Sequence, residues 1–168
     1  MSYITTEDFD TILAQSIETT EVIQEYIDRF ENVYIRQILG VELGNLFIAD
    51  ANPGPATPPY DALEDAIIEQ EDGIIYESAG MKQILIYFIL YEYVKGEQAK
   101  NSQSGGVIAN AETSNVLGFE NATRYGETRF NEALEWAHTI QWYCCTFKPT
   151  DYPEFDGVKI RAKYSALL

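Results

Sequence analysis

The chain has 168 residues, a length that suits one domain able to fold without disulfides or metal ions. It carries 27 acidic and 11 basic residues, and residues 1–80 hold 17 of the acids but only 2 of the bases. This balance argues against direct binding of nucleic acid and fits either a solvated helical face or a surface that repels DNA, such as the wall of a channel.

The first third of the chain predicts helices separated by a loop. Residues 5–13 favour a short helix, because threonines that can cap it are followed by acids. A longer amphipathic helix is predicted over residues 19–39, and Gly40 is expected to end it. Residues 41–50 are ambiguous in pattern and could form another helical turn. The proline-rich residues 51–59 predict a loop.

The middle of the chain predicts two further helices. Residues 60–70 favour a short helix, and residues 72–80 favour a small hairpin or an extended turn. Residues 81–98 predict a helix that is apolar on almost every side, as expected of a helix at the centre of a core. Its apolar run is shorter than the roughly 18–20 residues that a membrane span requires. The sequence therefore predicts a buried helix and no contact with a membrane.

Residues 100–125 form a predicted arm between this helix and a last one near residues 126–147. They are rich in glycine, asparagine and serine, and they exceed the usual length of a connection inside a domain. On the residues alone two interpretations stay open: an ordered arm that embraces a neighbouring subunit, which the resemblance described below favours, and a mobile solvent loop. The candidate partner-binding residues of the arm are Asn101, Gly105, Gly106, Asn110, Asn115 and Asn121.

The end of the chain differs in character from the rest. Residues 158–168 alternate apolar and basic side chains, a pattern typical of a strand added to a partner's sheet or of a peptide laid in an acidic groove. The alternative is a frayed terminus. The candidate partner-binding residues of this tail are Lys159, Ile160, Arg161, Lys163 and Tyr164.

These elements predict a mainly α fold, namely a four- to five-helix bundle with a long projecting loop and an extended C-terminal tail. The expected bundle domain covers residues 1–147 and includes the arm. The expected docking tail covers residues 148–168.

Few residues are suited to catalysis. Glu135 and His138 have the Glu-x-x-His spacing of di-iron bundles, but such a site needs a second copy of the motif and His138 is the sole histidine. The adjacent Cys144 and Cys145 are interpreted as thiols of the core or of a helix end. We therefore assign no catalytic, metal-binding or cofactor-binding residue, and a helical metal-dependent enzyme is the least favoured interpretation.

Four segments between residues 80 and 143 resemble a known family. They are Tyr-Glu-Tyr-Val-Lys at residues 91–95, Lys-Asn at 100–101 before a glycine-containing loop, Arg-Phe-Asn-Glu at 129–132 and Ile-Gln-Trp-Tyr at 140–143. Together they make the chain resemble the head-to-tail connector proteins, also called adaptor or ring proteins, of tailed phages that infect Bacteroidetes, including crAss-like phages.

The resemblance implies a non-enzymatic structural protein of the virion. Family members are small helical proteins that form a ring, usually twelve-fold, beneath the portal and around the DNA channel. The implied partners are further copies of the chain, the portal protein and other neck or tail proteins, with no specific binding of nucleic acid. The implied location is the head–tail junction of the virion, and the host cytoplasm during assembly. An acidic helical DNA mimic or inhibitor is the main alternative.

Overall fold

The computed structural model describes residues 2–10, 12, 17–51, 55–103 and 119–157. The fold is mainly helical, as the sequence predicts. In chain order its elements are the 3-10 helix η1 (Thr6–Phe9), α1 (Ile17–Leu39), α2 (Val41–Ala51), α3 (Asp61–Glu64), the strands β1 (Ile67–Glu71) and β2 (Ile74–Ser78), α4 (Met81–Gln103), α5 (Phe119–Trp142) and a π-helical turn η2 (Tyr143–Phe147).

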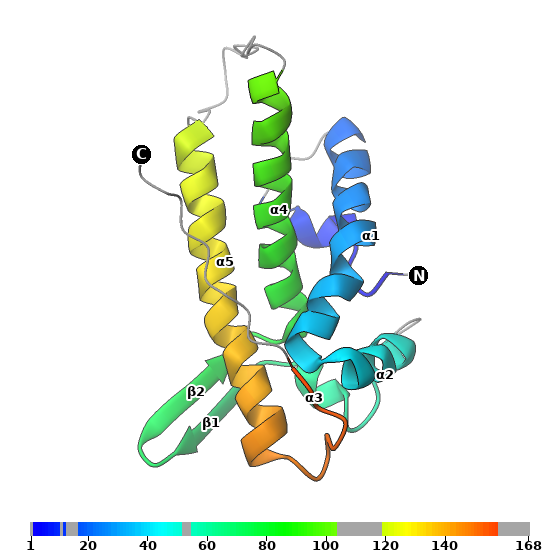
Figure 1. Ribbon diagram of the computed structural model, residues 1–168, viewed down its shortest axis with the longest axis vertical. Helices are drawn as coiled ribbons and strands as arrows, with labels where there is room; N and C mark the ends of the chain where they lie inside the picture. The colour runs from blue at the N-terminus through cyan, green and yellow to red at the C-terminus, as the bar shows by residue number, and fades with distance from the viewer. Residues whose placement is uncertain (1, 11, 13–16, 52–54, 104–118, 158–168) are drawn as a thin grey trace.

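Three long helices form the body of the molecule (Figure 1). Helices α4 and α5 lie side by side and antiparallel, and α1 packs on the other side of α4. At the lower end of the body, as drawn in Figure 1, the β1–β2 hairpin projects to one side and α2 lies on the other. The hairpin and α2 therefore occupy opposite sides of the same end.

Helix α4 is central because its sequence is apolar all round. Its buried side chains are Met81, Ile84, Leu85, Ile86, Phe88, Ile89, Leu90 and Tyr91. Phe88 stacks on Phe130 of α5 with 4.3 Å between ring centroids, and both rings are fully buried. The predicted all-round apolar helix is confirmed, and the structure packs it against α5.

Polar contacts between distant parts of the chain fix α1 within this core. The Tyr34 hydroxyl donates to a Glu92 carboxylate oxygen of α4 at 2.7 Å, and burial followed by this carboxylate raises the pKa of Tyr34. The nearly buried Glu31 accepts a hydrogen bond from the backbone N–H of Ile4 at 2.7 Å. Because buried polar groups are costly unless paired, these contacts hold the N-terminal segment and α1 in one arrangement.

A glycine separates α1 from α2. Gly40 has φ +84°, which lets α1 end at Leu39 and α2 begin at Val41 without an intervening loop. The C-terminal segment crosses this junction, and the Asp156 backbone N–H donates to the Leu39 carbonyl at 3.4 Å. A side chain at position 40 would meet the Asp156 backbone. The tail expected from residue 148 is therefore packed on the body as far as Gly157.

The predicted helix over residues 60–70 is wrong beyond Glu64. The chain instead forms an antiparallel hairpin in which Ile67 pairs with Ser78 and Glu71 with Ile74. Asp72 and Gly73 have φ +50° and +80°, the conformation of a two-residue hairpin turn, and the β-branched isoleucines beside them suit strands. The turn thus outweighs the helical spacing on which the prediction rests.

The helices on each side of the predicted arm are longer than the sequence indicates. Helix α4 continues to Gln103 and α5 begins at Phe119, so both enter the segment assigned to the arm. Residues 104–118, which form the rest of the arm, lie outside the described part of the chain.

One ion pair makes the stability of the N-terminal segment depend on pH. Asp8 accepts from the Thr5 backbone N–H at 2.9 Å and lies 2.8 Å from the Lys82 ammonium. Burial favours a higher pKa for Asp8, but Lys82 and Thr5 outweigh it and the pKa is lowered. The resulting stabilisation is complete above the usual aspartate pKa of about 4 and is lost as the pH falls through the lowered value.

We expect Asp8→Asn to cost about 1 kcal/mol at neutral pH and to reduce the dependence of stability on pH below about pH 4. Urea unfolding at neutral and acidic pH measures both effects. The exposed Glu7 offers a matched control, since Glu7→Gln should keep the wild-type pH dependence. An Asp8→Asn variant with the wild-type pH dependence would contradict this role of Asp8.

Candidate interaction surfaces

The structure places two of the candidate binding residues of the arm and none of those of the tail. Asn101 lies in the last turn of α4 and Asn121 in the first turn of α5, so both belong to the same end of this helix pair. The remaining candidates lie outside the described residues: Gly105, Gly106, Asn110 and Asn115 of the arm, and Lys159, Ile160, Arg161, Lys163 and Tyr164 of the tail.

The residues considered for catalysis are not gathered in one site. Glu135 and His138 are exposed on α5. Cys144 is fully buried, and burial followed by the neighbouring Cys145 raises the pKa of its thiol, whereas Cys145 is exposed. Among the described residues, no cluster of three or more His, Cys, Asp or Glu side chains is arranged to hold a metal ion.

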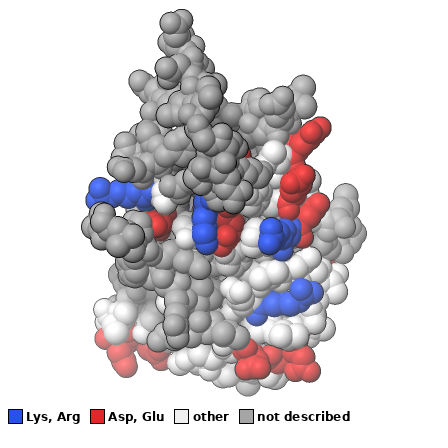
Figure 2. Space-filling view, turned by 45° about the horizontal axis from the view of Figure 1, so that its top comes forward, with Lys and Arg blue, Asp and Glu red and all other residues white. Residues whose placement is uncertain are grey.

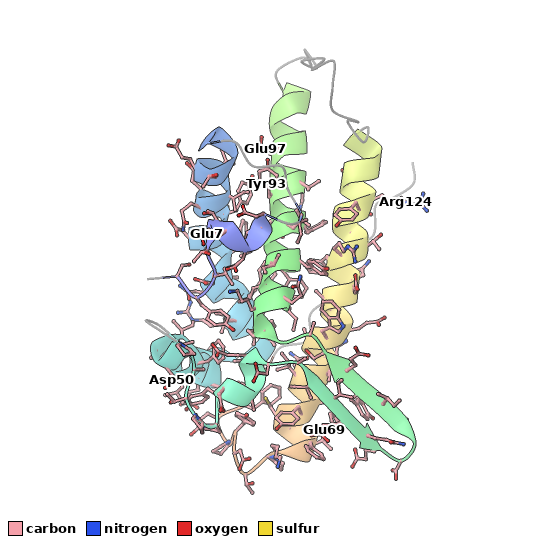
Figure 3. The ribbon with its side chains drawn as sticks, turned by 180° about the vertical axis from the view of Figure 1, so that it is seen from behind. Glu7, Asp50, Glu69, Tyr93, Glu97 and Arg124 are labelled. Carbon is pink, nitrogen blue, oxygen red and sulfur yellow. The ribbon has the colours of Figure 1, made fainter. Side chains whose placement is uncertain are left out.

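Aromatic and cationic side chains line the contact between α4 and α5. The Arg129 guanidinium lies over the rings of Tyr87 and Tyr125 at 5.4 and 5.1 Å, and its N–H donates to Glu132 at 2.7 Å. This hydrogen bond to Glu132 is the main cause of the raised pKa of Arg129. Arg124, one turn earlier, points outward from α5 (Figure 3). Arg129 therefore joins tyrosine rings of both helices, and its charge is paired with Glu132.

Aromatic contacts also join α4 to α1. Tyr93 points from α4 toward α1 (Figure 3) and meets Tyr26 edge-on at 5.8 Å, and Tyr26 stacks on Phe30 at 6.0 Å. In this part of the chain tyrosines are structural, because they fill the seam between two helices with ring edges.

The hairpin presents an exposed apolar surface that the sequence prediction missed. Ile68, Ile74 and Ile75 are 70%, 56% and 68% exposed. The hairpin is held to α5 by Tyr76, whose ring stacks on Trp142 at 3.9 Å with 2° between the planes. Its signal in the sequence is the Asp-Gly pair with Ile-Ile directly after it.

The junction of α1 and α2 presents a second exposed apolar surface, which we call the corner. It consists of Val33, Arg36, Val41 and Leu46, with the exposed Arg29 one turn before Val33. The Arg36 Nε–H donates to the Asn45 side-chain oxygen at 2.8 Å and so ties the two helices together.

Charge is divided between parts of the surface. Residues 37–81, which include α2 and the hairpin, contain acids but no base. On the face drawn in Figure 2, acidic side chains lie along the lower edge and basic side chains lie across the middle. A second acidic group stands at the upper right of that view. The acidic excess therefore forms separate patches.

Comparisons of the chain with profiles of protein families, with curated proteins and with solved structures find no match. The class of protein is defined here by the fold and its surfaces: a mainly α domain with exposed apolar side chains on both sides of one end. No helix in the described part of the chain has the length and apolar character of a membrane span.

Proposed function

We propose that the chain is a non-enzymatic structural protein of a phage virion, the adaptor that joins the portal vertex to the tail. Copies form a ring around the DNA channel through one interface repeated about an axis. The chain needs no cofactor, and its partners are further copies of itself, the portal protein and other neck or tail proteins. It is located at the head–tail junction, and in the host cytoplasm during assembly.

The observation that carries the proposal is the α4–α5 pair. The segments that resemble the adaptor family, between residues 91 and 143, lie on these two helices and at the end of α5, and they supply Tyr91, Phe130 and Ile140 to the core. The resemblance therefore falls on the two helices at the centre of the fold. The arm joins the two helices of that core, which is the position expected of an element that reaches a neighbouring subunit.

The finer architecture belongs to the same proposal. Helices α1, α2, α4 and α5 act as one bundle over residues 1–147, and the arm and the C-terminal tail extend from it as contact elements. Residues 149–157 lead the chain back to the junction of α1 and α2, so the basic tail starts there at residue 158. The tail docks on the portal protein.

The distribution of charge supports the proposal that the protein lines a DNA channel and does not bind the DNA. The formal net charge is −16, and residues 37–81 have no base that could neutralise a phosphate. A channel lined by such a surface repels the DNA backbone and lets the duplex slide through.

Electron microscopy of the purified chain, alone and with the portal protein, tests the proposal directly. We expect rings on the portal vertex and none on unrelated assemblies. A chain that stays monomeric with the portal and instead binds a basic protein would overturn the proposal in favour of the DNA-mimic interpretation.

Removing residues 158–168 is expected to abolish binding to the portal while the fold is kept, because residues 149–157 and their packing on the α1–α2 junction stay in place. Lys159→Glu with Lys163→Glu should weaken binding and reduce its dependence on salt, since each desolvated contact contributes roughly 1–3 kcal/mol. A pull-down at several salt concentrations measures both variants. Lys148→Glu, outside the basic residues 158–168, is the control, and wild-type binding by the truncated chain would exclude a docking role for these residues.

A further inference from the structure

We propose that the β1–β2 hairpin of one copy docks on the corner formed by α1 and α2 of the next copy. The inference rests on the proposed ring and names the contact that closes it. The occupant of the hairpin surface is thus a second copy of this chain.

The first observation is where exposed apolar side chains lie. Among the described residues, eight large apolar side chains are exposed, and six of them belong to the hairpin or the corner. The six are Ile68, Ile74 and Ile75 of the hairpin and Val33, Val41 and Leu46 of the corner. Single exposed apolar residues are ordinary, but two such groups at the same end of a domain indicate interaction surfaces.

The two faces of the hairpin differ: one is anchored to α5, and the other presents exposed isoleucines. Ile68 pairs with Glu77 and Gln70 with Ile75, so Ile68 and Ile75 are diagonal neighbours on the face opposite Tyr76. Tyr76 occupies the inner face, which it shares with Ile74, and anchors the hairpin through its stack on Trp142. An isolated two-stranded sheet is marginally stable in water, so a partner that covers its outer face stabilises it.

The corner offers a surface of matching character. Val33, at 43% exposure, stands between Arg29 and Arg36 at helical spacing on α1. Arg36 donates to Asn45 of α2, so its guanidinium lies at the junction of the two helices, one turn after the exposed Val33. The corner therefore combines apolar side chains with guanidinium groups.

The charges of the two surfaces are complementary. The hairpin carries acids and no base; Glu77 shares the outer face with Ile68 and Ile75, Asp72 lies in the turn, and Glu69 and Glu71 lie on the face of Tyr76. Residues 32–41, which form most of the corner, contain Arg36 and no acid, and Arg29 lies one turn before them. Glu42 shares the exposed face of α2, and the two arginines outweigh it. Complementary charge of this kind fixes the register of an interface and suppresses wrong pairings.

The positions of the two surfaces favour a head-to-tail contact. The hairpin and α2 lie on opposite sides of the same end in Figure 1, and Figure 3 gives the same arrangement from behind, with Asp50 on the α2 side and Glu69 on the hairpin side. A copy can therefore offer its hairpin to one neighbour and its corner to the other. A contact of this heterologous type repeats around an axis and closes into a ring.

Cysteine cross-linking in rings assembled on the portal protein tests the contact. In a Cys145→Ser background, which removes the exposed native thiol, one protein carries Ile75→Cys and a second carries Val33→Cys. With a short bis-maleimide we expect covalent dimers from the mixture of the two proteins and none from either alone. One chain carrying both substitutions should give a ladder of oligomers. A mixture of Ile75→Cys with Tyr125→Cys, an exposed position at the other end of α5, is the control and should give none.

The possible outcomes distinguish failure of the hairpin contact from failure of the adaptor proposal. Rings without the expected cross-link overturn the hairpin contact and leave the adaptor proposal standing. Cross-linking of Ile75→Cys with itself shows a two-fold contact and also overturns it. Wild-type protein that forms no ring with or without the portal protein overturns both proposals.

A second variant tests the energetic role of the hairpin surface. Ile68→Ser with Ile75→Ser should leave the circular dichroism spectrum unchanged, because both side chains are mostly exposed. It should weaken self-association roughly tenfold for each buried isoleucine that is lost. Tyr125→Ser, an exposed aromatic outside both surfaces, should leave association at the wild-type level. Equal association of the hairpin variant and the wild type would overturn the contact.

Discussion

Phe130→Ala is expected to lower the free energy of unfolding by about 3–5 kcal/mol, a large fraction of the stability of a domain of this size. The Phe130 ring is fully buried and contacts three aromatic rings on two helices, at 4.3 Å from Phe88, 5.1 Å from Tyr91 and 6.3 Å from Tyr34. Its removal leaves a cavity where α1, α4 and α5 meet, and the long helices cannot collapse to fill it.

Urea unfolding followed by circular dichroism measures this loss. Phe147→Ala is the matched control, because Phe147 is 38% exposed at the end of the aromatic stack beside the hairpin. We expect the control to lose about 1 kcal/mol or less. Equal losses for the two variants would show that the seam between α4 and α5 is not the centre of the core.

Gly40→Ala is expected to destabilise the protein by roughly 2–5 kcal/mol, from the strain of a left-handed backbone and from overpacking. At φ +84° a side chain is strained, and the added methyl group would also meet the backbone of Asp156. The crossing segment must then move away from the junction of α1 and α2. Thermal or urea unfolding measures the loss.

Gly73→Ala separates the two causes. Gly73 has a similar φ of +80° in the hairpin turn, but nothing lies within 4 Å of a methyl group placed there. The control should lose only the backbone contribution, roughly 1–2 kcal/mol. If Gly40→Ala is as stable as Gly73→Ala, residues 150–157 do not pack closely against the α1–α2 junction.

The helical core could be predicted from the sequence because its signals are local and strong. The apolar residues from Ile84 to Tyr91 leave no polar face for solvent, and Phe130, Leu134 and Ala137 recur at helical spacing on the partner helix. Gly40 marks a helix end that the structure confirms. These features depend on a few turns of chain and not on distant contacts.

The hairpin could not be predicted as securely, because its two signals conflict. Leu63, Ala66 and Ile67 have helical spacing, whereas Asp72-Gly73 with Ile74 and Ile75 favours a tight turn between strands. The turn prevails, and the hairpin is also held by a tertiary contact, the stack of Tyr76 on Trp142, which lies far along the chain. The return of residues 149–157 to the corner is equally hidden, since only three-dimensional packing brings Asp156 to Leu39.

The hydrogen bonds that complete the α1–α2 junction form late during synthesis of the chain. The Gln141 amide donates to the Ile38 carbonyl at 2.9 Å across a sequence separation of 103 residues, and Asp156 reaches Leu39 from still further along the chain. A ribosome adds roughly 5–20 residues per second, so the N-terminal helices wait several seconds for these partners. Until then, the Ile38 and Leu39 carbonyls at this junction lack those donors. The α1–α2 junction of a nascent chain therefore stays incomplete until residues 141 to 156 have been synthesised.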